Sequence, residues 1–208
     1  KSNTTTINNF SSIFKKGKSY AILGESGSGK STIVDLMLFL LKPQSGEIFL
    51  DNNRDLTKIT HLENKYRIQK KSLLIGQNDF NYGSYVRDFL NLPPHLEKDK
   101  ITLRKLKKAI KCLKMEKIFE KNIFNTYIGE NGSKLSGGQI QRIFLIKAYL
   151  SKKQIIFFDE ATSALDKENE KRAIDLLFDK EFFDSQRILI FSTHSAEIAK
   201  VCDHRIKI

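Results

Sequence analysis

A glycine-rich stretch at residues 24–32 carries the clearest chemical pattern in the sequence. It reads Gly-Glu-Ser-Gly-Ser-Gly-Lys-Ser-Thr and fits the spacing G-x-x-x-x-G-K-[ST] of a phosphate-binding loop. The glycines let the backbone wrap closely around a polyphosphate, and the N–H groups at the start of the following helix favour an anion there. Lys30 supplies a compact charge for the β- and γ-phosphates, and the Ser31 hydroxyl is a ligand for Mg²⁺. A turn that binds nothing would have no need of the Lys-Ser-Thr that ends this stretch.

A second pattern is a pair of carboxylates that follows an apolar run. Residues 155–158 are Ile-Ile-Phe-Phe, as expected of a central parallel strand, and Asp159 and Glu160 come directly after them. Open α/β sheets bind ligands at the carboxyl ends of their strands. Asp159 can therefore hold Mg²⁺, directly or through water, and Glu160 can act as a general base on an attacking water. The alternative is a pair of acids that only caps the next helix, but the phosphate loop in the same chain favours the catalytic interpretation.

The elements that must position these residues follow from the periodicity of the apolar residues. Residues 20–23 predict a strand, and residues 30–41 predict a helix that ends before Pro43. A turn at residues 45–46 precedes a predicted strand at 47–50, and the chain is then mostly helical from about 77 to 134. The remaining predicted elements are a helix to about residue 150, a strand at 154–158, a helix at about 169–178 and a strand at 187–192. Strands that alternate with helices predict an α/β domain with a largely parallel sheet and an inserted helical subdomain.

The composition limits the classes of protein that fit. With 208 residues, 40% of them apolar, the chain can bury roughly 70% of its unfolded surface as one domain. Its longest apolar run, residues 33–41, is broken by Asp35 and is far shorter than the roughly 20 residues of a membrane-spanning helix. Cys112 and Cys202 are isolated, which indicates reduced cysteines in a cytosolic setting. The net charge of +12 comes in good part from residues 98–121, where Lys and Arg recur at helical spacing without interleaved aromatics; this favours a solvated helix face over a nucleic-acid patch.

Residues 135–139, Leu-Ser-Gly-Gly-Gln, resemble the signature motif of the ABC ATPase family, and Gln141-Arg142 continue the resemblance. Three more matches occur in the family's order: Gln77 resembles the Q-loop glutamine, residues 163–166 (Ser-Ala-Leu-Asp) resemble the D-loop, and His194 resembles the switch histidine. The matches cover nearly the whole chain. They imply a P-loop NTPase core with a mostly parallel sheet, a small antiparallel β region and an inserted α-helical subdomain. The expected division of this single domain is about 1–76 and 141–208 for the core and about 77–140 for the helical subdomain.

The resemblance also implies the roles of individual residues, with ATP and Mg²⁺ as ligands. The catalytic residues would be Glu160, His194 and Gln77, with His194 contacting the γ-phosphate and helping to place the attacking water. The Mg²⁺ ligands would be Ser31, Gln77 and Asp159. The nucleotide-binding residues would be Gly24, Glu25, Ser26, Gly27, Ser28, Gly29, Lys30, Ser31, Thr32, Ser136, Gly137, Gly138 and Gln139.

The signature residues are expected to open a helix and so to present free N–H groups to an anion. Without the resemblance, Ser136-Gly137-Gly138 reads as a plain loop. In the family this turn binds the ATP of the partner subunit. The resemblance therefore implies a head-to-tail dimer of two copies with two composite ATP sites.

Two further segments favour an exporter. Residues 77–89 resemble the exporter pattern that follows the Q-loop and meets the coupling helices of the membrane domain, and residues 126–132 resemble the exporter segment before the signature. The alternative is two surface loops of a generic helical subdomain. The resemblance implies a transmembrane domain as partner, fused before Lys1, and a location on the cytoplasmic face of the cell membrane. The family's adenine-stacking aromatic would also lie upstream of Lys1, and relatives usually continue beyond Ile208, so we expect a longer natural polypeptide.

The rival interpretation is a soluble ABC ATPase that acts on nucleic acid or ribosomes, which the net charge of +12 keeps open. Chromosome- and repair-type relatives carry a very long coiled-coil insertion, for which the interval between Lys30 and Ser136 leaves no room. Translation-type relatives carry two such domains, and one is present here. We therefore expect no nucleic-acid partner. A protein that binds nucleotide without hydrolysing it conflicts with the presence of Glu160 and His194.

Overall fold

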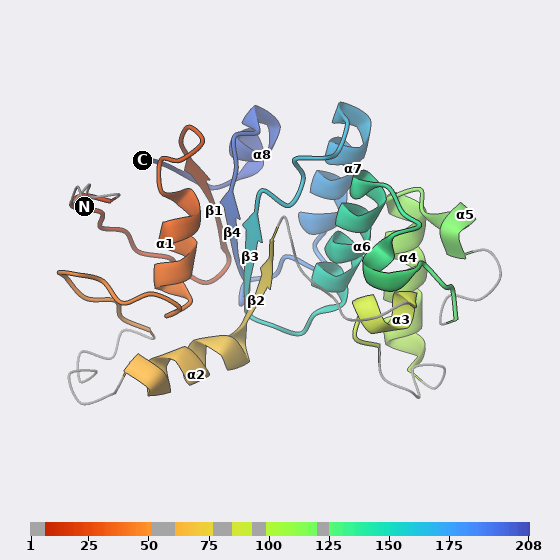
Figure 1. Cartoon of the computed structure of the whole chain (residues 1–208), viewed down its shortest axis with the longest axis horizontal. Coiled ribbons are helices and arrows are strands. Elements are labelled where there is room, and N and C mark those ends of the chain that lie inside the picture. The colour runs from red at the N-terminus through yellow and green to blue at the C-terminus, as the bar shows by residue number, and fades with distance from the viewer. Residues whose placement is uncertain (1–6, 51–60, 77–84, 93–98, 120–124) are drawn as a thin grey trace. The chain divides into compact units, whose positions relative to one another are not determined.

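The computed structural model describes residues 7–50, 61–76, 85–92, 99–119 and 125–208. Its strands are β1 (Lys18–Leu23), β2 (Ser72–Ile75), β3 (Ile155–Asp159), β4 (Ile188–Ser192) and β5 (His204–Lys207). Its helices are α1 (Lys30–Met37), α2 (His61–Lys71), α3 (Val86–Phe89), α4 (Lys100–Cys112), α5 (Glu116–Phe119), the 3₁₀ turn η3 (Glu130–Gly132), α6 (Gly137–Leu150), α7 (Lys167–Leu177) and α8 (Ala196–Val201) (Figure 1). None of the helices in these ranges is long and apolar enough to cross a membrane.

The chain divides into two compact units, one of residues 1–74, 153–159 and 185–208 and the other of residues 75–152 and 160–184. We call them the sheet unit and the helical unit. Residues 141–152 and 160–184 thus group with the helical unit. The expected division into a core and a helical subdomain of about 77–140 stays a prediction.

The sheet unit is built on five strands in the order β2-β3-β4-β1-β5. The pairs β1/β4, β1/β5 and β3/β4 are parallel, which confirms the predicted parallel α/β architecture. The strands are apolar because they are covered: α1 packs against β3 and β4, and α8 packs against β1 (Figure 1). The core includes Ile22, Ile33, Phe157 and Ile190. Phe158 and Phe191 stack at 4.6 Å between ring centroids, so the ends of β3 and β4 are fixed side by side.

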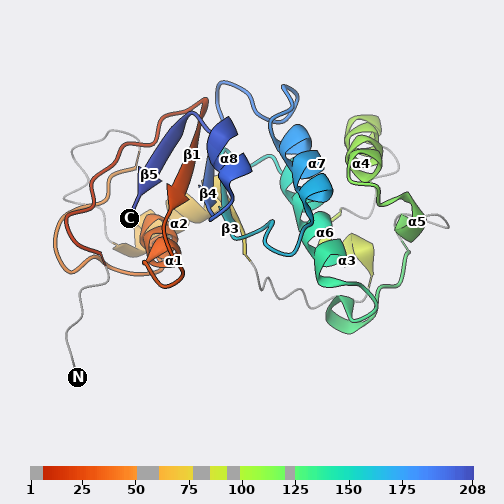
Figure 2. The same cartoon turned by 90° about the horizontal axis from the view of Figure 1, so that it is seen from above.

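In the helical unit, α4, α6 and α7 pack against one another in pairs (Figure 2). The basic residues of α4 alternate with an apolar stripe, and the stripe is buried at Leu106, Ala109 and Ile110. Asp99 begins this helix by accepting hydrogen bonds from the backbone N–H groups of Ile101 and Thr102. The lysines of α4 therefore lie on the helix face away from the core, as the spacing predicts.

Two predicted elements differ in the structure. The helix that starts at Lys30 ends at Met37 and not at Leu41, because the chain turns at Phe39, which has a φ of +55°. Residues 47–50 form no strand. Ile48 and Leu50 do pack on the core, so the alternation predicts which side chains turn inward, but a strand also needs a hydrogen-bonded neighbour. The small antiparallel β region is not seen in the described ranges, where the antiparallel pairing is the isolated bridge between Tyr85 and Tyr127.

Candidate functional site

The phosphate loop connects the end of β1 to the start of α1, as its motif predicts. Gly29 precedes the first residue of α1 with a φ of +99°, and Gly27 has a φ of +80°. Side chains with a Cβ rarely adopt these conformations, which accounts for glycine at both positions. Ser28 donates its backbone N–H to the carbonyl oxygen of Glu25 at 3.2 Å, closing the turn. The backbone therefore curves around a space at the amino end of α1.

Lys30 lies inside this turn. Its side chain is buried, and Nζ donates to the carbonyl oxygens of Gly24 at 2.9 Å and Glu25 at 2.8 Å. The hydroxyl of Ser28 is also buried, and it has no hydrogen-bond partner in the part of the chain that the structure describes. A buried hydroxyl without a partner is unfavourable unless a ligand or water completes it. The loop thus offers one charge and one open hydrogen-bonding group to an anion.

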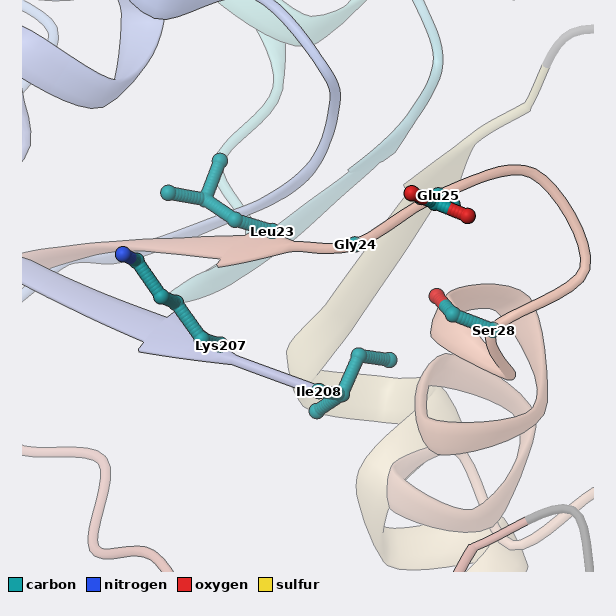
Figure 3. Close-up of a pocket in the computed structure, with 6 residues that line it drawn as sticks. All are labelled: Leu23, Gly24, Glu25, Ser28, Lys207 and Ile208. Carbon is teal, nitrogen blue, oxygen red and sulfur yellow. The ribbon is translucent and has the colours of Figure 1, made fainter.

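An open hollow of about 470 Å³ lies beside the loop (Figure 3). Its lining residues are Leu23, Gly24, Glu25, Ser28, Lys207 and Ile208. A Cβ at Gly24 would come within 2.3 Å of the Ser28 hydroxyl and 3.0 Å of the Ile208 side chain. A side chain at this position would therefore crowd Ser28 and Ile208 where the hollow meets the phosphate loop.

Asp159, the first of the two acids, lies at the same edge of the sheet. Asp159 ends β3 and is in register with Ser192 of β4, which is in turn in register with Ile22 of β1. One carboxylate oxygen of Asp159, Oδ1, is buried and lacks a hydrogen-bond partner among the described residues. Burial raises the pKa of Asp35 on α1 above its usual range, and the negative charge of Asp159 raises it further. An unpaired carboxylate oxygen beside a second acid suits a cation, so Asp159 and the exposed Ser31 of α1 fit Mg²⁺.

Glu160 follows with a φ of +50°. A left-handed conformation is uncommon for a residue other than glycine and is enriched at functional sites. Its carbonyl oxygen accepts the backbone N–H of Ser163 at 3.1 Å, which starts the loop of residues 160–166. The backbone therefore bends sharply between the metal-binding candidate and the candidate base.

His194 lies just beyond the end of β4, and its side chain is exposed. Its neighbour Thr193 donates its backbone N–H to the carbonyl oxygen of Ile22 at 3.2 Å, so the turn is fastened to β1. The sheet unit thus brings residues 24–32, Asp159 and His194 to one sheet edge. By contrast, His204 stacks on Tyr20 at 4.9 Å between ring centroids, which is a packing role.

The signature turn belongs to the helical unit. Ser136 Oγ accepts the backbone N–H of Gln139 at 3.3 Å, and Gln139 Oε1 accepts the backbone N–H of Ser136 at 2.8 Å. This capping box begins α6 at Gly137, so the helix opens and ends where it is predicted to, at Leu150. Ser136 and Gly137 are exposed. Gln77, the remaining predicted site residue, lies outside the described residues.

Sequence reasoning gave no role to Gln141 and Arg142, although both are part of the site's framework. Gln141 is 5% exposed and contacts residues 163 and 164. Arg142 contacts residues 113, 138 and 169. The sequence did hold a signal, because a glutamine and an arginine precede a run of apolar residues on α6. Buried polar side chains need hydrogen-bond partners, so the two residues indicate contacts with other segments.

Comparison with known proteins identifies the family. The model of the ABC transporter family matches residues 7–163. ABC transporter B family member 14 of Arabidopsis thaliana is 36% identical over 177 residues, which are 83% of this chain and 14% of that protein. The ATP-dependent lipid A-core flippase of Aliivibrio fischeri is 37% identical over 79% of this chain and 27% of its own length.

Two further relatives extend the match. The energy-coupling factor transporter ATP-binding protein EcfA1 of Mycoplasmopsis synoviae is 34% identical over 95% of this chain and 70% of its own length. A solved structure of a bacterial Atm1-family ABC exporter with ATP bound superposes with a TM-score of 0.72 at 24% identity, covering 94% of this chain and 32% of that one. The chain thus spans a minor part of most of these proteins, and its fold is theirs. It belongs to the ABC transporter family, in which it is an ATP-binding domain.

Proposed function

We propose that this domain hydrolyses Mg²⁺-bound ATP as the motor of a membrane exporter. The observation that carries the proposal is the sheet edge at which residues 24–32, Asp159 and His194 lie together. Lys30 and the N–H groups that start α1 bind and orient the β- and γ-phosphates. Mg²⁺ would be held by Ser31 and Asp159, together with Gln77, and would neutralise charge on the phosphate oxygens.

The catalytic step is assigned to Glu160 and His194. Glu160 accepts the proton of the attacking water, and His194 helps to orient that water at the γ-phosphate. Little covalent chemistry is asked of the protein, because phosphoryl transfer depends mainly on position and charge. The sharp bend at Glu160 supports this assignment, because it sets the base apart from the buried end of β3.

The second half of each site comes from another copy of the chain. The turn at residues 136–139 has the properties of a phosphate contact: exposed residues, a helix start, and no acidic side chain in the first turn of α6. Two copies arranged head to tail would each supply this turn to the nucleotide of the other. ATP would then hold the dimer together.

The exporter assignment rests on residues 77–89 and 126–132 and on relatives such as the flippase of Aliivibrio fischeri. The described ends of the two segments lie side by side: Val86 donates its N–H to the carbonyl oxygen of Thr126 at 3.0 Å, and the rings of Tyr85 and Tyr127 meet at 5.5 Å. Both tyrosines are exposed. They would form part of the surface that meets a transmembrane domain, fused N-terminal to this domain, at the cytoplasmic face of the membrane.

Single-turnover hydrolysis, measured beside nucleotide affinity, tests the catalytic assignment. Glu160→Gln should hydrolyse ATP about 10² to 10⁴ times more slowly and bind it unchanged, because only the proton acceptor is lost. Asp159→Asn should lower the rate of hydrolysis and also weaken the Mg²⁺ dependence of nucleotide binding, because it alters a metal site. Hydrolysis by Glu160→Gln at the parental rate would refute the assignment.

A binding assay tests the rival role on nucleic acid or ribosomes. We expect no saturable binding to duplex DNA or to ribosomes at physiological salt, since the lysines of α4 lie on one solvated helix face. Tight binding that weakens steeply with salt would replace the exporter proposal with the nucleic-acid role.

A further inference from the structure

Ser192 ends β4 with a buried hydroxyl to which the proposed catalytic step gives no role. The residue is 1% exposed, and its Oγ has no hydrogen-bond partner among the residues that the structure describes. The four residues before it in β4 are apolar, so packing alone gives no reason for a hydroxyl here. Because a buried hydroxyl is unfavourable unless it is hydrogen-bonded, Ser192 indicates a partner at the end of this strand.

The side chain of Ser192 lies on the same face of the sheet as the side chain of Asp159. The two residues are partners in the parallel register of β3 and β4, and register partners in neighbouring strands point to the same side. Phe157 and Ile190, two positions earlier in each strand, pack in one cluster with Ile33 of α1. The hydroxyl and the carboxylate therefore lie side by side on the face that α1 covers.

Two buried polar atoms without partners are thus neighbours at the sheet edge. Asp159 Oδ1, like Ser192 Oγ, forms no hydrogen bond within the described ranges, so the two atoms do not bond to each other. A water can join polar groups that are too far apart for direct contact, provided that it finds at least two of them. Such a water would accept the O–H of Ser192 and donate to the carboxylate oxygen of Asp159. One water between the two strands therefore satisfies both atoms.

We propose that Ser192 is a positioning residue of the Mg²⁺ site, which holds the carboxylate of Asp159 through a shared buried water. The inference rests on the proposed function, in which Asp159 and Ser31 hold Mg²⁺. A hydrogen-bonded partner fixes the orientation of a metal-binding carboxylate and so raises the affinity for the metal. The two oxygens of a carboxylate offer about four acceptor sites, so the water and the cation do not compete for Asp159. Loss of the hydroxyl should therefore change the Mg²⁺ requirement and not phosphate binding itself.

The test uses Ser192→Ala, which removes the hydroxyl and little else. At a fixed concentration of a fluorescent, non-hydrolysable ATP analogue, the Mg²⁺ concentration for half-maximal binding should rise about tenfold, as is typical when the partner of a metal ligand is lost. Binding of the analogue in EDTA should equal that of the parental protein, because the phosphate loop is intact. Ser192→Thr keeps the hydroxyl and should keep the parental Mg²⁺ requirement.

Ser19→Ala is the matched control, because Ser19 is also a buried serine on a strand of the sheet unit. It lies near the start of β1, where its hydroxyl donates to Asp203 Oδ2 at 2.8 Å. This variant should lose stability and leave the Mg²⁺ requirement unchanged. The melting temperature without nucleotide or metal is a second measurement. Ser192→Ala should lower it by about 2–4 °C, as expected for the loss of a single hydrogen bond in a chain of this size.

The outcomes separate this inference from the function on which it rests. A parental Mg²⁺ requirement in Ser192→Ala, or an equal loss in Ser192→Thr, overturns the inference and leaves the proposed function standing. A melting temperature that does not fall in Ser192→Ala also overturns it, because the hydroxyl would then be buried without a partner. Analogue binding by the parental protein that does not depend on Mg²⁺ contradicts the proposed function itself.

Discussion

The phosphate-loop edge of the sheet unit and the signature turn of the helical unit are built in different ways. At the sheet edge, Asp159 and the backbone around residues 22 and 192 are held by parallel ladders over a buried apolar core. At the signature turn, Ser136, Gln139 and Gln141 are held by side-chain hydrogen bonds to loop and cap backbone. The hydrogen bonds of a strand ladder join many backbone groups, so no single side chain decides whether they form. Each side-chain hydrogen bond, in contrast, is lost when one residue is replaced. Substitutions should therefore act on chemistry in the first region and on assembly in the second.

The sharpest test of this contrast asks whether the two regions work in different copies. Gly137→Asp places a carboxylate on the exposed signature turn, where the described atom nearest to a new Cβ is the Cβ of Ala164, at 3.8 Å. We expect hydrolysis to be lost while nucleotide affinity stays, because the acid repels phosphate yet suits the start of a helix. Lys30→Ala should be inactive as well.

Mixing these two inactive proteins should restore about a quarter of the parental activity, because half of the dimers then contain one intact composite site. Steady-state hydrolysis against the mixing ratio measures this. If the mixture stays inactive although mixed dimers form, the two regions do not complete each other's sites.

A smaller effect is expected on nucleotide binding alone. Lys30→Ala should weaken ATP binding about tenfold to a hundredfold, because it removes hydrogen bonds from a charged donor. Lys200→Ala is the matched control, since Lys200 lies in the same unit and pairs only at the surface with Glu197. Titration with a fluorescent nucleotide compares the two. Equal nucleotide affinities of the two variants would show that Lys30 does not bind the nucleotide.

Glycine substitutions compare the two regions through stability. Gly29→Ala should cost about 1–2 kcal/mol of unfolding free energy, since the backbone is left-handed there. Gly138→Ala should cost about 1 kcal/mol through crowding against Ala164, and Gly137→Ala less than about 0.5 kcal/mol. Denaturant unfolding of the three variants gives the order. A Gly138→Ala variant as stable as Gly137→Ala would contradict the close contact between the signature turn and the loop of residues 160–166.

The smallest expected effect depends on pH. The raised pKa of Asp35 means that its charged form is disfavoured in the folded protein. Ionisation of Asp35 above its folded pKa therefore lowers the stability of the protein. Asp35→Asn should raise the melting temperature by roughly 1–2 °C at pH 7. The difference should shrink as the pH falls and vanish below 3.8, the ordinary pKa, where Asp35 becomes protonated in both the folded and the unfolded state. Addition of Mg²⁺ and ATP should reduce the gain, since a cation at Asp159 offsets the repulsion.

The sequence predicted the sheet edge better than the helical unit for a physical reason. A continuous apolar run that ends in a charged residue, as at Phe158-Asp159, is typical of a strand that is covered on both sides. The sequence alone therefore indicates both the strand and the point where it ends. The start of α6 was predicted through the family resemblance alone, although the cap that Ser136 and Gln139 form there is local in sequence. The prediction of a strand at 47–50 was wrong, because strand pairing depends on a neighbour that periodicity does not specify. The contacts of Gln141 with residues 163 and 164 were hidden because they join segments that are distant in sequence.

The resting position of Lys30 has a consequence for which anions the loop accepts. Its ammonium group already holds two carbonyl oxygens, at 2.8 and 2.9 Å, so an incoming ligand must compete with the loop itself. A small anion such as sulfate presents its oxygens at a single point of the loop, so it reaches few of the loop's donors in exchange. A polyphosphate chain offers acceptors along the whole loop, so the hydrogen bonds that it forms outnumber the two that Lys30 gives up. The loop should therefore discriminate against the inorganic phosphate and sulfate of its surroundings, even though each carries the charge that the site attracts.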